Sequence, residues 1–259
     1  MSARRAAAHA AACGLVLLTA GCAARGPVRP GGTAADDPAA LTALAGATVH
    51  CSPLRTATTE IRLSGRAGPQ RIRARLLAGF AEPASVRLEA LAPFGAPALV
   101  LAADGTATTL YFPREKQVLR EAPVASVLEA LTGLALDAAE LRRMIFGCLA
   151  PPGAHGERYG AAWQAVAAGD TRVYLRDGVP VAADYRGWQI DYAGHVSGVA
   201  RQVRVRRAVA AGPIDLLATL GEVEMNIDLD PRAFVVDVPA DAVGISLGDL
   251  RQSSPLTAR

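Results

Sequence analysis

Runs in which apolar and polar residues alternate at every second position constrain the fold of this 259-residue chain more than any other feature. In residues 71–76, arginines occupy every second position, and Ile72 and Leu76 lie between them. Similar runs cover residues 60–64 and 86–90. Successive side chains of a strand point to opposite faces, so such runs predict an antiparallel sheet with one buried face.

The alternation continues along most of the chain, with one interruption. We expect further strands at residues 99–103, 108–112, 116–120, 161–167, 171–176, 179–186, 189–192, 202–209, 216–228 and 234–238. The dipeptides Asp104-Gly105 and Asp177-Gly178 favour tight hairpin turns. An open sheet with this many strands is expected to curl.

Three segments have the period of a helix instead. Asp36 or Asp37 would cap the first, with Pro38 in its first turn. The second covers residues 124–133, and the third covers residues 137–147. The predicted fold class is therefore α+β, mainly β: a curled antiparallel sheet, or half-barrel, with an N-terminal helix and a helical lid.

The concave side of such a sheet would carry small aliphatic side chains and few aromatic ones. The helices could fill this side as an ordinary core, or they could cover a dry cavity able to hold acyl chains. Periodicity does not distinguish the two arrangements. For the second arrangement, the expected cavity lining is Ile61, Leu63, Ile72, Leu76, Val86, Leu88, Leu99, Leu101, Val127, Leu128, Leu131, Leu141 and Ile145.

The N-terminus has the pattern of an export signal. Arg4 and Arg5 precede an apolar span, residues 10–20, which is too short to cross a bilayer as a helix. The run Leu-Thr-Ala-Gly-Cys that closes the span at Cys22 resembles the lipobox of bacterial lipoproteins, with Thr19 in place of the commoner Leu. The resemblance implies cleavage before Cys22, and a diacylglycerol thioether and an N-acyl chain on that residue. The alternative is an ordinary secretory signal that is cut nearby.

This interpretation divides the chain into four parts. They are a signal peptide (1–21), a flexible tether with lipidated Cys22 (22–35), a folded domain (36–250) and a C-terminal tail (251–259). Ala23, rather than Asp, follows the lipid site, and this resembles lipoproteins that are sorted outward. We therefore expect a protein that is lipid-anchored in the outer membrane and faces the periplasm.

Two cysteines remain after Cys13 is assigned to the signal and Cys22 to the lipid. In an oxidising compartment, a disulfide between Cys51 and Cys148 is favoured. It would close a loop of nearly a hundred residues. Two free buried thiols are the alternative.

Bulk charge and motifs argue against several classes of protein. Removing the two arginines of the signal takes the formal charge from +3 to +1, so the domain lacks the basic footprint of a nucleic-acid-binding protein. His50, His155 and His195 do not have the spacing of a metal-binding helix, and Ser197 does not lie in a nucleophile elbow. We expect no enzymatic activity, no cofactor, no metal site and no nucleic-acid partner.

Three segments resemble LolB, the outer-membrane lipoprotein receptor family. In residues 85–99 a strand leads into the turn Pro-Phe-Gly at 93–95. In residues 131–147 a Leu-Thr-Gly helix end precedes the pattern Leu-Arg-x-x-Ile-x-Gly. Residues 188–192 are similar to a later Trp-x-Val-x-Tyr strand of the family.

The resemblance implies a monomer that takes acylated lipoproteins from a LolA-like periplasmic chaperone and inserts them into the outer membrane. Pro93, Phe94 and Gly95 match the family's exposed apolar loop, which implies that Phe94 enters the bilayer; packing of Phe94 into its own core is the alternative. The chain departs from the family in having Phe rather than Leu in this turn, in its cysteine pair, and in extra length after Asp228.

Other functions are compatible with the same half-barrel. The chain could be a lipid-sensing regulatory lipoprotein, which would hold a protein partner and show no transfer activity. It could also carry another lipid, which the identity of a co-purified ligand would reveal. A periplasmic hydrolase would instead show a nucleophile and a base converging in the cavity.

Overall fold

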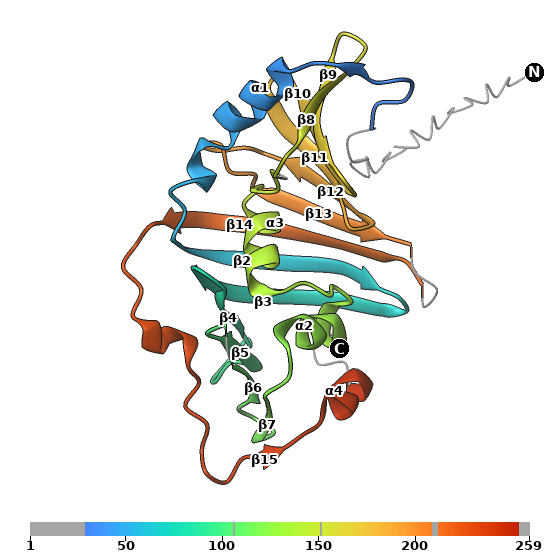
Figure 1. The fold of residues 1–259 in the computed structure, drawn as a ribbon. Helices are drawn as coiled ribbons and strands as arrows, with labels where there is room; N and C mark the ends of the chain where they lie inside the picture. Colours follow the sequence, from blue (N-terminus) through green and yellow to red (C-terminus); the bar gives the residue numbers. More distant parts are fainter. Residues whose placement is uncertain (1–28, 106, 151, 209–211, 254–259) are drawn as a thin grey trace, which may run out of the picture.

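The computed structural model describes residues 29–253 apart from 106, 151 and 209–211. The expected signal peptide, Cys22, residues 22–28 of the expected tether and residues 254–259 lie outside the described residues. Within the described part, one sheet of 15 strands twists along its length, with a few helices packed on it (Figure 1). The expected fold class, mainly β with a curled antiparallel sheet, is confirmed.

The strands are β1 (Ala35–Asp36), β2 (Thr56–Ala67), β3 (Gln70–Ala81), β4 (Ser85–Ala90), β5 (Leu99–Ala103), β6 (Thr108–Phe112), β7 (Gln117–Arg120), β8 (His155–Tyr159), β9 (Trp163–Ala168), β10 (Thr171–Arg176), β11 (Val179–Tyr185), β12 (Trp188–Ala193), β13 (Gln202–Arg207), β14 (Ile214–Met225) and β15 (Val243–Gly244). The helices are α1 (Ala39–Ala47), η1 (Val49–Cys51), α2 (Val124–Thr132), α3 (Ala138–Ile145), η2 (Pro231–Phe234) and α4 (Leu247–Ser253). The first three residues of the expected C-terminal tail therefore belong to α4.

Two meanders build the sheet. One runs from β2 to β7 and the other from β8 to β14, and β14 pairs antiparallel with β2, with Ala218 opposite Leu63. The first and last long strands of the chain thus lie side by side in the middle of the sheet. At the edges, β1 pairs with β8, and β15 pairs in parallel with β7.

The alternation of β3 explains why the sheet has one dry face. Ile72 and Leu76 are buried, while the arginines between them are exposed. Both expected Asp-Gly turns occur in hairpins, between β5 and β6 and between β10 and β11. Asp177 and Gly178 both have positive φ (52° and 74°), as the tight turn requires.

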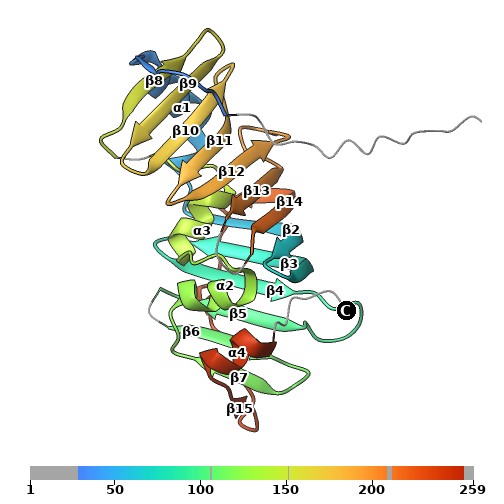
Figure 2. The same cartoon turned by 90° about the vertical axis from the view of Figure 1, so that its right-hand side faces the viewer.

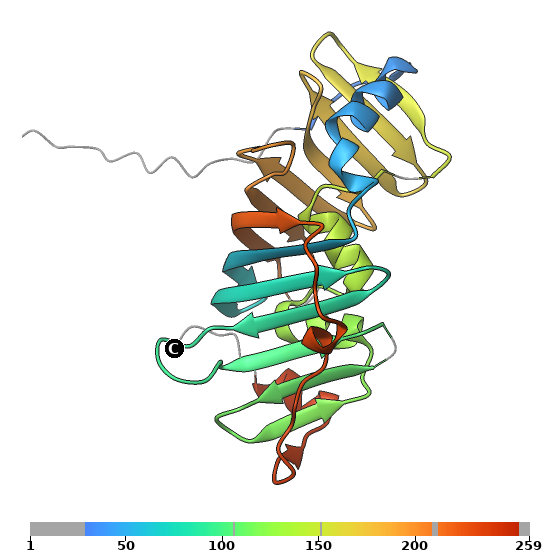
Figure 3. The same ribbon diagram turned by 90° about the vertical axis from the view of Figure 1, so that its left-hand side faces the viewer.

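The helices cover the apolar, concave face. Residues of α1, α2, α3 and α4 belong to one continuous buried cluster with the inward side chains of the strands. Because the sheet twists, α2, α3 and α4 lie in front of it in Figure 2, whereas α1 faces the viewer in Figure 3. No helix among the described residues is long and apolar enough to cross a membrane.

A strap, residues 226–242, returns across the opposite, outer face of the sheet (Figure 3). The prediction of a strand at 234–238 is wrong. Phe234 ends the short helix η2, and its side chain is buried against the sheet. Arg87 of β4 fastens the strap by donating to the carbonyl oxygens of Ala233 (2.7 Å) and Val235 (3.2 Å). These carbonyls therefore bond to a side chain and not to a neighbouring strand.

The N-terminal segment is also held by the sheet. The guanidinium of Arg29 donates to the carboxylates of Asp184 (2.7 Å) and Asp191 (3.1 Å). It also donates to the carbonyl oxygens of Ala183 (3.0 Å) and Ile190 (3.2 Å). A residue of the expected flexible tether is thus fixed to β11 and β12.

Candidate functional site

An apolar cavity of about 80 Å³ lies between the concave face of the sheet and the helices α2 and α3. Strands β2, β3, β4, β13 and β14 form its floor, and the two helices with their connection form its roof. The lining residues are Ile61, Leu63, Leu76, Leu88, Leu128, Thr132, Leu134, Leu141, Met144, Ile145, Val203, Val205, Leu216 and Ala218.

The cavity offers no free polar group. Thr132 is its one polar lining residue in the described chain, and its hydroxyl donates to the Leu128 carbonyl at 2.7 Å, within α2. A cavity without polar partners stays dry. Pockets that hold drug-sized ligands measure about 300–1,000 Å³, so a long acyl chain would fit only if the roof moved.

The structure brings seven of the thirteen expected lining residues to this cavity. They are Ile61, Leu63, Leu76, Leu88, Leu128, Leu141 and Ile145. The other six are buried in the core but do not line it: Ile72, Val86, Leu99, Leu101, Val127 and Leu131. Val203 and Val205, which were missed on β13, alternate with Arg204 and Arg206, and this signal was present in the sequence. Leu216 and Ala218, which were missed on β14, have no such charged neighbours on both sides.

The start of α3 is tied to the turn after β11 through Glu140. In a capping box, Asp137 accepts from the Glu140 backbone N–H (2.7 Å), and Glu140 accepts from the Asp137 backbone N–H (3.0 Å). The Glu140 carboxylate also accepts from the Tyr185 hydroxyl (2.7 Å) and from the Arg186 guanidinium. Burial raises the pKa of Glu140, but the hydrogen bonds from Asp137, Tyr185 and Arg186 outweigh it and hold that pKa below its ordinary value.

Two further hydrogen bonds hold α3 along its length. Arg142 donates to Glu82, beside the start of β4, at 3.1 Å. The buried hydroxyl of Tyr192, on β12, donates to the Met144 carbonyl at 3.0 Å, and burial raises the pKa of Tyr192.

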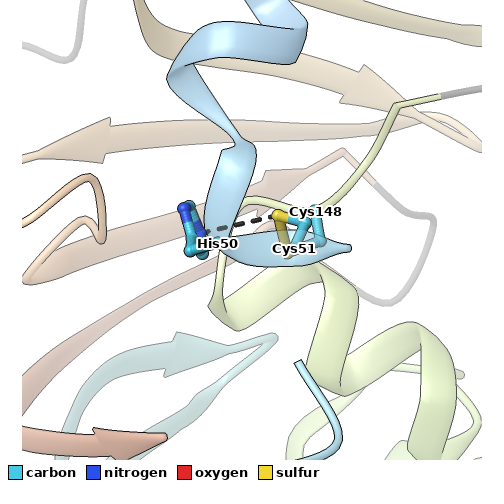
Figure 4. Close-up of side chains that lie close together, drawn as sticks. All are labelled: His50, Cys51 and Cys148. Atoms are coloured by element: carbon cyan, nitrogen blue, oxygen red, sulfur yellow. Dashed lines mark hydrogen bonds between the residues drawn. A yellow bond between two sulfur atoms is a disulfide. The ribbon is translucent and has the colours of Figure 1, made fainter. Parts of the chain in front are cut away.

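The segment that follows α3 is bonded covalently to η1 (Figure 4). Cys51 and Cys148 form a disulfide, with an S–S distance of 2.06 Å. Next to it, His50 Nε2 donates to the Phe146 carbonyl at 3.0 Å. These three side chains form the one group in the described residues with the spacing of a metal site, but their sulfur atoms are bonded to each other and offer no thiolate to an ion.

Helix α2 has far fewer ties. In the described part of the chain, its ion pair is between Glu129 and Arg251 of α4, at 3.8 Å and with both side chains half exposed. The helix ends at Gly133, whose φ is +80°; a Cβ there would lie 2.7 Å from Ile214 Cδ1. The two helices of the roof therefore differ in their polar and covalent ties: α3 is held by several hydrogen bonds and a disulfide, and α2 by an exposed ion pair beside its buried apolar face.

The turn between β4 and β5 exposes a large apolar side chain. Phe94 is 87% exposed, so it does not fill its own core. Arg114, from the turn between β6 and β7, donates to the Phe94 carbonyl at 2.7 Å and so links the two turns. An apolar side chain held in this way lies ready for contact with an apolar partner.

A second hollow, of about 500 Å³, lies under the strap on the outer face. Its walls carry the carboxylates of Glu60, Glu89, Glu222 and Glu224. Burying an acyl chain against these charges would be unfavourable. The apolar cavity on the concave face is therefore the better candidate for a lipid site.

No protein-family model matches the chain, and no curated protein matches it. Solved structures similar to it include a LolA superfamily protein from Nitrosomonas europaea (12% identity, TM-score 0.45) and a DUF1329 family protein from Desulfovibrio piger (12%, 0.46). Another is a provisionally named outer-membrane lipoprotein-sorting domain from Vibrio parahaemolyticus (13%, 0.41). Each alignment covers 76% of this chain and 97% of the other. At these identities and TM-scores, the similarity assigns neither a family nor an activity.

Replacing Glu140 tests how α3 is held. Glu140→Gln is expected to lower the free energy of unfolding by about 1–3 kcal/mol, because buried hydrogen bonds to a charge are lost. A lowered folded-state pKa means that this contribution is present above the ordinary pKa of 4.5 and is lost as the pH falls through the folded-state value. Denaturant unfolding at neutral pH and below pH 4.5 measures this dependence. The free energy of unfolding should fall more in acid for the wild type than for the variant.

The matched control is Glu129→Gln, which removes the same charge from the half-exposed pair on α2. It is expected to change the free energy of unfolding by less than about 0.5 kcal/mol. If the free energy of unfolding falls equally in acid for the wild type and for Glu140→Gln, the ionised Glu140 carboxylate does not hold α3.

Proposed function

We propose that this chain is a lipid-anchored carrier that receives acylated lipoproteins from a periplasmic chaperone and delivers them to the outer membrane. The observation that carries the proposal is the dry cavity between the sheet and two helices, which has no polar group free to bind water. Hydrocarbon is the ligand chemistry that such a surface favours. The lipobox-like sequence before Cys22 and the exposed Phe94 support the same function.

Loading requires the cavity to open, and the unequal ties of the roof indicate how. Helix α3 is held by Glu140, Arg142, Tyr192 and the Cys148 disulfide, so it stays on the sheet. Helix α2 would move away with α4 and extend the cavity along β2, β3 and β4. The resulting groove would grip acyl chains by area alone, since each buried CH₂ contributes about 0.8 kcal/mol.

No group-transfer chemistry is needed for delivery. The acyl chains would move from the chaperone to this cavity and then to the bilayer in order of increasing affinity. The exposed Phe94 would bring the loaded carrier into contact with the membrane, where an apolar side chain on a projecting turn partitions favourably.

A transfer assay tests the proposal. The full chain, reconstituted in vesicles, is mixed with a triacylated lipoprotein bound to a LolA-like chaperone, and the location of the lipoprotein is followed by cross-linking and by vesicle flotation. We expect the lipoprotein to cross-link first to this chain and then to float with the vesicles. If it stays on the chaperone, the receptor function is wrong. If mass spectrometry finds a different lipid bound, the chain carries that lipid instead.

Filling the cavity tests the site itself. In Ala218→Leu the larger side chain would occupy most of the cavity. A bound acyl chain would then overpack the site, which costs about 1–3 kcal/mol, so binding of cis-parinaric acid is expected to weaken about tenfold or more. Without ligand, the variant should be as stable as the wild type or more stable, since closing 80 Å³ of empty space contributes up to about 2 kcal/mol.

The control is Ala193→Leu, the same substitution at an exposed position of the same sheet. It should leave fatty-acid binding unchanged. Normal binding by Ala218→Leu would place the lipid site elsewhere.

A further inference from the structure

We propose that the outer face of the β2–β3 hairpin, together with the loop of Phe94, docks onto a membrane that contains anionic phospholipids. The hairpin contributes Arg66, Arg71 and Arg73, which are called the arginine surface below. Their guanidinium groups would bind the lipid phosphates while Phe94 enters the bilayer beside them. This inference needs neither a lipid on Cys22 nor an acyl cargo, so it can hold even if the proposed function fails.

Strand register places the three arginines on one face. Arg66 lies directly opposite Arg71, and Arg73 lies opposite Ser64. Ile72, between the two arginines of β3, is buried on the concave side. The arginine surface therefore lies on the outer face, away from the helices.

No ion pair in the described residues compensates the charge of this surface, and Asp215, which lies opposite Arg66 in the register of β14 and β2, pairs with another arginine. All three side chains are exposed, and in the described part of the chain none makes an ion pair or a side-chain hydrogen bond. The nearby acidic groups are already bound: Glu60 to Arg75 at 2.6 Å, and Asp215 to Arg204 at 2.6 Å.

Such an arrangement works against the stability of the sheet. Like charges directly opposite each other destabilise an antiparallel pair, as Arg66 lies opposite Arg71. The next such pair, Arg62 opposite Arg75, shares Glu60 as an acidic partner, whereas Arg66 and Arg71 have no ion pair in the described residues. An external anion would relieve this repulsion. Phosphate suits the site because a guanidinium binds phosphate oxygens through two parallel hydrogen bonds.

Phe94 projects from the same edge of the sheet. The backbone N–H of Leu91, where the loop begins, donates to the Arg75 carbonyl at 2.8 Å. Figure 2 shows the loop between β4 and β5 beside the end of the β2–β3 hairpin. Arg114 adds a further cation under the loop through its bond to the Phe94 carbonyl.

An anionic bilayer matches both parts of this edge. Its head groups supply phosphate to the arginines, and its hydrocarbon receives Phe94. A soluble phosphate would bind the arginines but leave an 87%-exposed aromatic ring in water. The near-neutral charge of the domain argues against a nucleic acid. We therefore assign the surface to a membrane.

Arginine reactivity tests the assignment on the unmodified chain. The full chain is reconstituted into vesicles of phosphatidylcholine alone, or of phosphatidylcholine mixed with phosphatidylglycerol, and is treated with phenylglyoxal before peptide mass spectrometry. In the anionic vesicles, Arg66, Arg71 and Arg73 should react about fivefold more slowly than in the neutral ones. About 1 M salt should abolish the difference, because it shortens the screening length to about 3 Å.

Three arginines of the same molecule serve as internal controls. Arg120, Arg143 and Arg158 are exposed and carry no ion pair or side-chain hydrogen bond in the described residues, and none belongs to the hairpin. Their rates should be the same in both vesicles. Equal rates for the arginine surface in the two vesicles, or equal slowing of the controls, would overturn the assignment.

A second measurement tests whether the charges and the loop act together. Phe94→Trp in the full chain reports insertion through quenching by brominated lipids. Replacing the arginine surface with glutamines should reduce quenching in anionic vesicles to its value in neutral ones, and the same replacement of the three controls should not. Unchanged quenching without the arginine surface would show that Phe94 acts without it.

Discussion

Phe94→Glu is expected to leave the fold and acyl binding intact but to reduce insertion of lipoproteins into vesicles by at least about tenfold. The side chain is 87% exposed, so its replacement should change the free energy of unfolding by less than about 0.5 kcal/mol. Its transfer into a membrane is worth about 1.5–3 kcal/mol, and a carboxylate would lose this energy and be repelled by anionic lipids. Flotation of the lipoprotein with vesicles measures insertion, and binding of cis-parinaric acid measures the cavity.

Val235→Glu is the matched control. Val235 is also an exposed apolar residue (57%), but it lies on the strap. The same new charge there should leave both insertion and acyl binding unchanged. Insertion at the normal rate by Phe94→Glu would exclude a role for the loop in delivery.

Loss of the disulfide is expected to have the largest effect on stability. Cys51 and Cys148 are 97 residues apart, and a cross-link over a loop of this length stabilises a protein by up to about 4.7 kcal/mol in the chain-entropy model. Replacing both cysteines with alanine should therefore lower the melting temperature by about 10 °C or more, at roughly 2–4 °C per kcal/mol. Thermal unfolding followed by circular dichroism measures the shift.

Reduction supplies the control for this prediction. A dithiol reductant should lower the melting temperature of the wild type toward that of the double variant and should not affect the variant itself. A wild type that melts at the same temperature with and without reductant would contradict the prediction.

The sequence predicts this sheet well where one side of a strand packs on the core. In β3 the inward residues Ile72 and Leu76 alternate with arginines, and the periodicity alone gives the face and the register of side chains. β8 was missed for a physical reason. Its inward position is Gly156, where a Cβ would lie 2.1 Å from the Asp37 carbonyl oxygen, so no apolar side chain marks the strand.

The outer position of the same strand is also unusual. Glu157 is buried and bound by both Arg172 (2.9 and 3.1 Å) and Tyr159 (2.8 Å). In the sequence, a charged residue between glycine and arginine is typical of a solvent-exposed loop. The strand therefore lacks alternation on both faces.

The cavity could be predicted only in part, because it depends on pairing between distant segments. Ile61 and Leu63 are recognisable as inward residues, but their neighbours Leu220 and Ala218 come from a strand about 155 residues later. Periodicity does not show that β14 returns to β2. It also does not show which inward residues lie under helix contacts and which border empty space.

The capture of Arg29 by Asp184 and Asp191 has a consequence for how far the domain can travel from the bilayer. Arg29 lies seven positions after Cys22, and a fully stretched chain gains at most about 3.6 Å per residue. With lipid on Cys22, the segment from Cys22 to Arg29 would span at most about 25 Å. A free linker up to residue 35 would reach further. The domain would then work in the water layer next to the lipid head groups, and a donor would have to come to it.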